Sequence, residues 1–215
     1  MTDPDLVVLH YTAMTGGPEP ALKRLCDPAT EVSCHYLIGE RGQTFRLVPE
    51  DRRAWHAGVG RWGDCMDVNS RSIGIELSND AESPFPAPQM DSLEKLLVDI
   101  MSRRPAITPE RVIGHSDVAP GRKIDPGPRF DWKRLARGGS AVWPDAHGSA
   151  APDIDLFRDL AWRAGYRADV KGDTLLSAIR LRFRPWATGP LDGDDMDIIG
   201  DVAERFPVDR PSAVA

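Results

Sequence analysis

The sequence lacks the features that mark several classes of protein. Its cysteines form an odd set without a CxxC pair, which argues against a disulfide framework or a cysteine zinc cluster and suits a reducing compartment; they are Cys26, Cys34 and Cys65. No apolar run approaches the roughly 20 residues that a membrane-spanning helix needs, so no transmembrane segment is expected. The net charge is −6 and lysine and arginine form no dense cluster, so nucleic acid is not an expected partner.

The N-terminus also lacks a basic segment followed by an apolar segment, which is the pattern of a secretory signal peptide. The first ten residues are MTDPDLVVLH. We therefore predict a cytoplasmic protein, or a periplasmic or envelope protein if an export signal has been removed. We expect the chain to act as a monomer.

Mixed strand and helix patterns over the first part of the chain predict an α/β (α+β) domain of residues 1–137. Short apolar segments between turn residues predict strands at residues 6–9, 34–38, 44–48, 72–77 and 112–115. Apolar residues at helical spacing predict helices at residues 18–25 and 89–103. The Gly/Trp-rich stretch 52–69 has no periodicity and predicts a long loop, and so does the Gly/Pro-rich stretch after His115.

A second, smaller unit is expected after a linker. Residues 138–152 are rich in glycine, proline and small residues, a composition typical of linkers, and His147 within them is expected in solvent. Beyond the linker, apolar residues spaced by three or four predict a three-helix domain over residues 153–207. Residues 208–215 are interpreted as a tail.

Three residues are candidate metal ligands. His10 and His115 each stand at the end of a predicted strand, and Asp125 lies in the loop after His115. Two histidines and one carboxylate, with a fourth position left for water, form a catalytic zinc site. The same set fits non-haem iron, so the residue types alone do not fix the metal. The simpler alternative is that Asp125 only initiates a turn before Pro126.

Two further charged residues are candidates for catalysis. Glu76 interrupts the apolar pattern of the strand SIGIEL, where a carboxylate is costly to bury without a partner. Glu76 is either a general base beside the metal or a residue on the solvated face of an edge strand. Lys123 lies two residues before Asp125; it either stabilises a developing oxyanion or is an ordinary solvated lysine.

A further group of residues is predicted to bind substrate. Trp55 and His56, with Trp62, are candidates for the wall of a groove that holds a sugar or a peptide, although tryptophans are as often core residues. Asn79 and His35 complete the group. For His35, a place in the core or behind the metal ligands is the favoured alternative.

Several motifs carry a resemblance to a known family. They are HYTA at His10, SCHYLI at His35, LVPE at Glu50, AWHAG at Trp55, SIGIEL at Glu76 and GHSDVAPGRKIDPGPRF at His115. Over roughly residues 6–145 the chain resembles the zinc-dependent N-acetylmuramoyl-L-alanine amidases, whose superfamily includes the peptidoglycan recognition proteins and the phage amidase lysozymes. WPDA at Trp143 and the segment RFRPW…GPLDGDD resemble, more loosely, members with a C-terminal peptidoglycan-binding-like domain.

The resemblance implies a fold, a site and a reaction. The fold is a mixed central β-sheet flanked by helices. His10, His115 and Asp125 fall where the family holds Zn²⁺. Glu76 falls at its catalytic carboxylate and Lys123 at its oxyanion-stabilising lysine. The implied reaction is hydrolysis of the amide between N-acetylmuramic acid, or its 1,6-anhydro form, and L-alanine in peptidoglycan or muropeptides, for cell-wall turnover or recycling. The alternative is a module that recognises muropeptides without cutting them.

Overall fold

One five-stranded mixed sheet forms the centre of the protein. The computed structural model describes residues 3–146, 148 and 150–209. Across the sheet the strands follow the order β3-β2-β4-β1-β5; their bounds are β1 Leu6–Tyr11, β2 Tyr36–Ile38, β3 Thr44–Arg46, β4 Ser72–Leu77 and β5 Val112–Gly114. All neighbours pair in parallel except β2 and β3, which are antiparallel. The predicted α/β class is confirmed, and so are the five predicted strands, with β2 and β3 each two residues shorter than expected.

Both faces of the sheet are buried, because β1 directs alternate side chains into two apolar clusters. Val7 and Leu9 belong to one cluster, together with the buried side of α3, Ala87–Arg103. The apolar residues that α3 contributes recur every three or four positions, the spacing of one helical face; they are Met90, Leu93, Leu97 and Ile100. Leu6 and Val8 belong to the other cluster, which includes residues of the 52–69 segment and of the C-terminal helices.

Short helical segments make up the remaining structure around the sheet. They are α1 Glu19–Leu25, α2 Val68–Arg71, α4 His115–Val118, α5 Trp132–Arg137 and the 3-10 helices η1 Pro28–Thr30 and η2 Pro109–Arg111. The predicted loop after His115 is wrong at its start, because His115 is the first residue of α4. One turn is too short to leave a hydrophobic period in the sequence. The Asp117 carboxylate stabilises that turn by accepting the backbone N–H of Gly114 at 2.8 Å.

The C-terminal part contains the three predicted helices, α6 Ile154–Ala164, α7 Gly172–Phe183 and α8 Gly193–Arg205. α6 begins after Asp153, whose carboxylate accepts two backbone N–H groups of the first turn, and ends at Gly165, which has a φ of 122°. The predicted linker and tail are only partly covered, since residues 147, 149 and 210–215 lie outside the described residues. His147, expected in solvent, is one of them.

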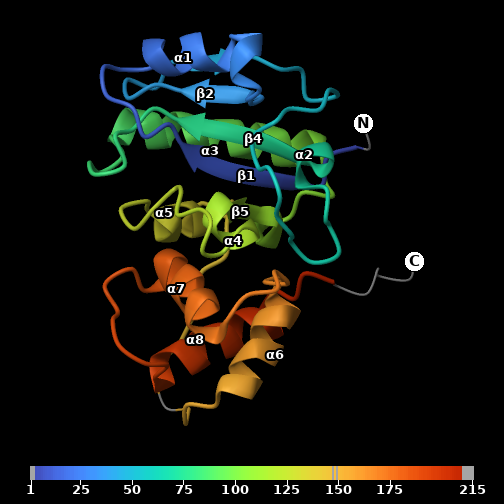
Figure 1. The fold of residues 1–215 in the computed structure, drawn as a ribbon, viewed down its shortest axis with the longest axis vertical. Helices are drawn as coiled ribbons and strands as arrows, with labels where there is room; N and C mark the ends of the chain where they lie inside the picture. The colour runs from blue at the N-terminus through green and yellow to red at the C-terminus, as the bar shows by residue number, and fades with distance from the viewer. Residues whose placement is uncertain (1–2, 147, 149, 210–215) are drawn as a thin grey trace.

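The apolar core continues from the sheet into the C-terminal helices. Ile113 of β5 and Val118 of α4 lie in the same buried cluster as Phe157, Ile179 and Phe183 of α6 and α7. In Figure 1 these helices stack directly below β5 and α4, on the side of the sheet away from β2. The expected domain boundary therefore marks a change in secondary structure without a break in the core. Among the described helices, none combines the length and the apolar character that crossing a membrane requires.

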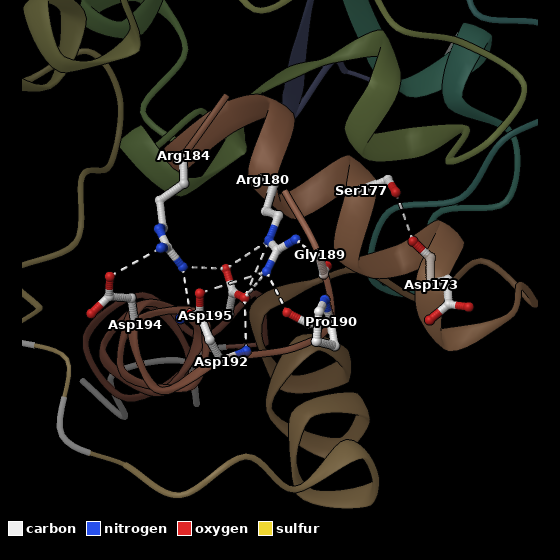
Figure 2. Close-up of polar contacts among 9 residues, drawn as sticks. All are labelled: Asp173, Ser177, Arg180, Arg184, Gly189, Pro190, Asp192, Asp194 and Asp195. Carbon is white, nitrogen blue, oxygen red and sulfur yellow. Dashed lines mark hydrogen bonds and ion pairs between the residues drawn. The ribbon is translucent and has the colours of Figure 1, made fainter. Parts of the chain in front are cut away.

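A network of arginines and aspartates fastens α7 to the start of α8 (Figure 2). The Arg180 guanidinium pairs with the buried Asp195 carboxylate at 2.5 Å and also donates to the carbonyl oxygens of Gly189 and Pro190, at 2.7 and 2.8 Å. Arg184 pairs with the same Asp195 carboxylate at 2.8 Å and with Asp194 at 3.0 Å. Asp195 thus receives two guanidinium groups in the interior of the helical unit.

Replacing Asp195 with alanine should lower the free energy of unfolding by about 3 kcal/mol, because it leaves the Arg180 charge buried without its main partner. The matched control is Asp194→Ala in the same helical turn. The Asp194 side chain is 56% exposed, so this change should cost less than about 1 kcal/mol. Urea unfolding followed by circular dichroism measures both, and equal losses would contradict the assignment of Asp195 as the centre of the network.

Candidate active site

The three candidate metal ligands come together at one edge of the sheet. His10 lies near the end of β1 and His115 directly follows β5, the parallel neighbour of β1, so the two chain directions deliver both imidazoles to the same edge. The loop after α4 returns Asp125 to them. The Nδ1 atoms of His10 and His115 are 3.0 Å apart, and they lie 2.9 and 3.0 Å from Asp125 Oδ2. All three residues are buried.

Hydrogen bonds on the far side of each ring decide which nitrogen carries the proton. His115 Nε2 donates to the carbonyl oxygen of Ala57 at 2.8 Å, and a carbonyl only accepts. His115 Nδ1 is therefore the nitrogen with a free lone pair, and it faces His10 and Asp125. The ring of His115 is held in the orientation and tautomer that a metal ligand needs.

A relay of hydrogen bonds that runs from Val68 through Ser72 and His56 sets the tautomer of His10. Ser72 donates its hydroxyl proton to the carbonyl oxygen of Val68 at 2.5 Å, so its oxygen accepts from His56 Nε2 at 3.3 Å. His56 Nδ1 is then the acceptor for the N–H of His10 Nε2, at 3.0 Å. Burial and the nearby His10 lower the pKa of His56 well below 6.5, which keeps His56 neutral and able to accept. The relay leaves the lone pair of His10 Nδ1 free.

The resulting geometry fits a divalent cation. Two imidazole nitrogens and one carboxylate oxygen converge within 3.0 Å of one another in the interior. Their lone pairs repel one another unless a positive charge lies among the three atoms. Burial, with His115 as the second cause, lowers the pKa of His10 to about 4. A neutral imidazole is the form that binds metal, so the donor set suits a zinc site with an open position.

Glu76 faces the same point from β4. It pairs in register with His10 across the parallel β1–β4 ladder, so both side chains leave the same face of the sheet. Because β4 is a central strand, the alternative that placed Glu76 on an edge strand is wrong. Its Oε2 atom is buried and has no hydrogen-bond partner among the described residues. Burial, followed by the negative charge of Asp125, raises the pKa of Glu76 well above 4.5.

These groups line one cavity with a volume of about 260 Å³. Lys123 and Trp55 border the cavity together with the three candidate ligands, His56 and Glu76. The Trp55 side chain is exposed and carries the Arg53 guanidinium on its ring, 4.3 Å from the centroid. A second depression shares Trp55, Leu25 and Ser33 with the first. The cavity around the candidate ligands therefore adjoins this second depression, and the Trp55 side chain borders both.

A family model described as N-acetylmuramoyl-L-alanine amidase matches residues 1–128. The chain belongs to this family. It is 34% identical to the N-acetylmuramoyl-L-alanine amidase AmiD of Escherichia coli K12, over 94% of this chain and 83% of AmiD. It is 46% identical to the 1,6-anhydro-N-acetylmuramyl-L-alanine amidase AmpD of Haemophilus influenzae, over 48% of this chain and 56% of AmpD.

Solved structures of relatives share the fold of this amidase over nearly its whole length. A complex of E. coli AmiD with anhydro-N-acetylmuramic acid-L-Ala-D-γ-Glu-L-Lys superposes with a TM-score of 0.83 at 34% identity and covers 94% of this chain and 90% of AmiD. AmpDh3 from Pseudomonas aeruginosa, in complex with anhydromuramic pentapeptide, superposes with a TM-score of 0.86 at 32% identity and covers 96% of this chain and 93% of AmpDh3. Both likenesses extend through the C-terminal helices.

Two residues predicted to bind substrate lie apart from the cavity of the amidase. His35 is fully buried; its Nδ1 accepts the backbone N–H of Gly74 at 2.9 Å and its Nε2 donates to the carbonyl oxygen of Arg52 at 3.1 Å. Asn79 is 4% exposed, and its side chain bonds to the backbone of Ala81 and Ser83. Neither is among the residues that line the cavity. Trp55 and His56 do line it, whereas Trp62, the third residue of the predicted groove wall, is buried in the apolar core.

The sequence interpretation missed the residues that support His10. A Cβ atom added to Gly74 would lie 2.4 Å from the His56 ring, so only glycine at this position lets the imidazole lie against β4. Ser72, two residues earlier on the same strand, completes the relay. The one sequence signal for this packing is a glycine in the middle of a buried strand, which often marks the close approach of another group.

Replacing His56 with phenylalanine should weaken the affinity of the amidase for Zn²⁺ about 10- to 100-fold, the usual effect of losing a partner behind a metal ligand. The variant keeps a ring over Gly74 but no longer accepts the proton of His10 Nε2. Competition with a chromophoric chelator measures the affinity. Trp55→Ala is the matched control, since Trp55 borders the same cavity without touching a ligand, and an equal loss in both variants would contradict the relay.

Proposed function

We propose that this amidase uses Zn²⁺, held by His10, His115 and Asp125, to hydrolyse the amide between N-acetylmuramic acid, or its 1,6-anhydro form, and L-alanine. The observation that carries the proposal is the convergence of three buried lone pairs beside a buried carboxylate oxygen of Glu76 that has no hydrogen-bond partner in the described part of the chain. The AmiD complex with anhydro-N-acetylmuramic acid-L-Ala-D-γ-Glu-L-Lys supports the choice of substrate. We choose zinc over iron because hydrolysis transfers no electron.

The bound metal supplies a Lewis acid that polarises the scissile carbonyl and lowers the pKa of a water toward about 7. His10 and His115 would hold the ion through their neutral Nδ1 atoms, and Asp125 would hold it through Oδ2 with one negative charge. Three protein ligands would keep a position open, which a closed set of four would not. The tautomers fixed by Ala57 and His56 keep both imidazoles from turning away.

Glu76 is proposed to act as the general base. Its free Oε2 accepts a proton from the attacking water and then delivers it to the nitrogen of the departing L-alanine, so that water and amide become a carboxyl group and an amine. Burial raises the pKa of Glu76, which makes its carboxylate a stronger base. Lys123, which borders the same cavity, donates an N–H to the developing oxyanion.

Glu76→Gln and Lys123→Ala should each lower kcat about 100-fold or more, because each removes one group that acts in the transition state. Both variants should still bind Zn²⁺, since neither residue is a proposed ligand. Ile124→Ala is the matched control, because this exposed side chain lies between Lys123 and Asp125 in the same loop. Activity like that of the unaltered protein in either purified variant would refute the role assigned to that residue.

Incubation with intact sacculi and with anhydro-muropeptides, followed by mass analysis, tests the reaction and its substrate form. We expect a sugar product without peptide and a free peptide that begins with L-alanine. Metal analysis of the purified protein should find one Zn²⁺ per chain. Binding of muropeptides with neither zinc nor cleavage would favour the alternative, a recognition module. We further propose that residues 153–207 form a peptidoglycan-binding-like unit that helps to hold glycan.

A further inference from the structure

Asp117 is a fully buried carboxylate two residues after the proposed ligand His115. Its Oδ2 accepts the backbone N–H of Gly114 at 2.8 Å and the Nη1–H of Arg182 at 2.7 Å. Its Oδ1 accepts the hydroxyl proton of Tyr166 at 2.8 Å. Two of these three donors come from the C-terminal part of the chain, while the carboxylate itself belongs to the turn that carries His115.

Arg182 reaches from α7 into the sheet domain. Only 3% of the residue is exposed, and its Nη2 donates to the carbonyl oxygen of Val112, the first residue of β5, at 3.2 Å. The guanidinium also stacks over the Trp132 ring, 4.2 Å from the centroid. Arg182 therefore contacts both the strand that leads to His115 and the turn that begins with it. Tyr166, just after α6, packs its ring against Trp62 at 5.0 Å.

The position of the His115 ring depends on the hydrogen bond that the Asp117 carboxylate accepts from the backbone N–H of Gly114. The bond from Gly114 N–H to Asp117 closes the first turn of α4, and His115 is the first residue of that turn. Without the Arg182 guanidinium, the buried Asp117 carboxylate loses its charged partner, and the carbonyl oxygen of Val112 loses the donor that ties β5 to α7. The Asp117 side chain is then no longer held against the backbone N–H of Gly114, and the turn that carries His115 loosens.

We propose that Arg182 and Tyr166 are positioning residues for the metal site, so that the C-terminal helices hold the His115 turn in its ligand geometry. The inference rests on the proposed zinc function. Packing of the two units needs no ion pair, because the shared apolar core around Phe157, Ile179 and Phe183 already joins them, and a buried ion pair adds little to stability over apolar residues of similar size. The Arg182–Asp117 ion pair instead holds α4 in one conformation.

The test compares Zn²⁺ affinity and stability in full-length variants. Arg182→Met should weaken Zn²⁺ binding about 10- to 100-fold, the range for residues that orient a ligand from behind. Tyr166→Phe should weaken it about 3- to 10-fold, because it removes one hydrogen bond to the Asp117 carboxylate and leaves the Arg182 ion pair in place. Ile179→Val is the matched control in the shared core; it should lower the melting temperature slightly and leave Zn²⁺ affinity within about twofold.

A double variant separates the effect of the unpaired Asp117 charge from the effect of the altered side-chain shape at Arg182. In Asp117→Asn/Arg182→Met both buried charges are gone, and the asparagine oxygen still accepts the N–H of Gly114, so Zn²⁺ affinity should recover most of the loss seen in Arg182→Met alone. The visible spectrum of the Co²⁺-loaded proteins reports the ligand geometry without any substrate, and we expect it to change in Arg182→Met and return in the double variant.

The outcomes distinguish this inference from the proposed function. If the unaltered protein binds no Zn²⁺, the proposed function fails. If it binds Zn²⁺ and folded Arg182→Met and Tyr166→Phe bind it equally well, the positioning role is overturned while the zinc function stands. A folded double variant that remains as weak as Arg182→Met would also overturn the role. Should Arg182→Met fail to fold, Tyr166→Phe still decides the question.

Discussion

Three electron-pair donors, two imidazole nitrogens and one carboxylate oxygen, face one another at 2.9–3.0 Å in the interior of the protein. This arrangement is unfavourable by itself, and the surrounding structure is what maintains it. Adjacent parallel strands supply His10 and His115 at one edge of the sheet, and a Gly/Pro-rich loop returns Asp125. The carbonyl of Ala57 and the relay through His56 then fix both rings, so the lone pairs point inward.

Burial shifts the pKa values of His10 and Glu76 in opposite directions, because in each residue it disfavours the charged form. It lowers the pKa of His10 to about 4 and raises the pKa of Glu76. Both shifts favour the neutral forms of these groups. In buried surroundings a cation interacts strongly with the groups that face it. Burial therefore raises the free-energy cost of forming the site and at the same time strengthens its interaction with a cation.

The C-terminal helices belong to the same physical unit as the site. They share an apolar cluster with β5 and α4, and Arg182 and Tyr166 neutralise and bind the carboxylate beside His115.

The sequence alone determined the strands, the main helices and the identity of the candidate ligands, because apolar periodicity and the motifs around His10 and His115 are local patterns. Only the tertiary structure decided that β4 is central and that the Oε2 atom of Glu76 is buried. It also decided that His56 supports His10 over Gly74 and that Arg182 reaches Asp117. It also placed His35 and Asn79, which were predicted to bind substrate, apart from the residues that line the cavity. Hydrogen bonds between residues 16 to 65 positions apart leave no periodic trace in a sequence, since each partner is compatible with many surroundings until the fold brings the two together.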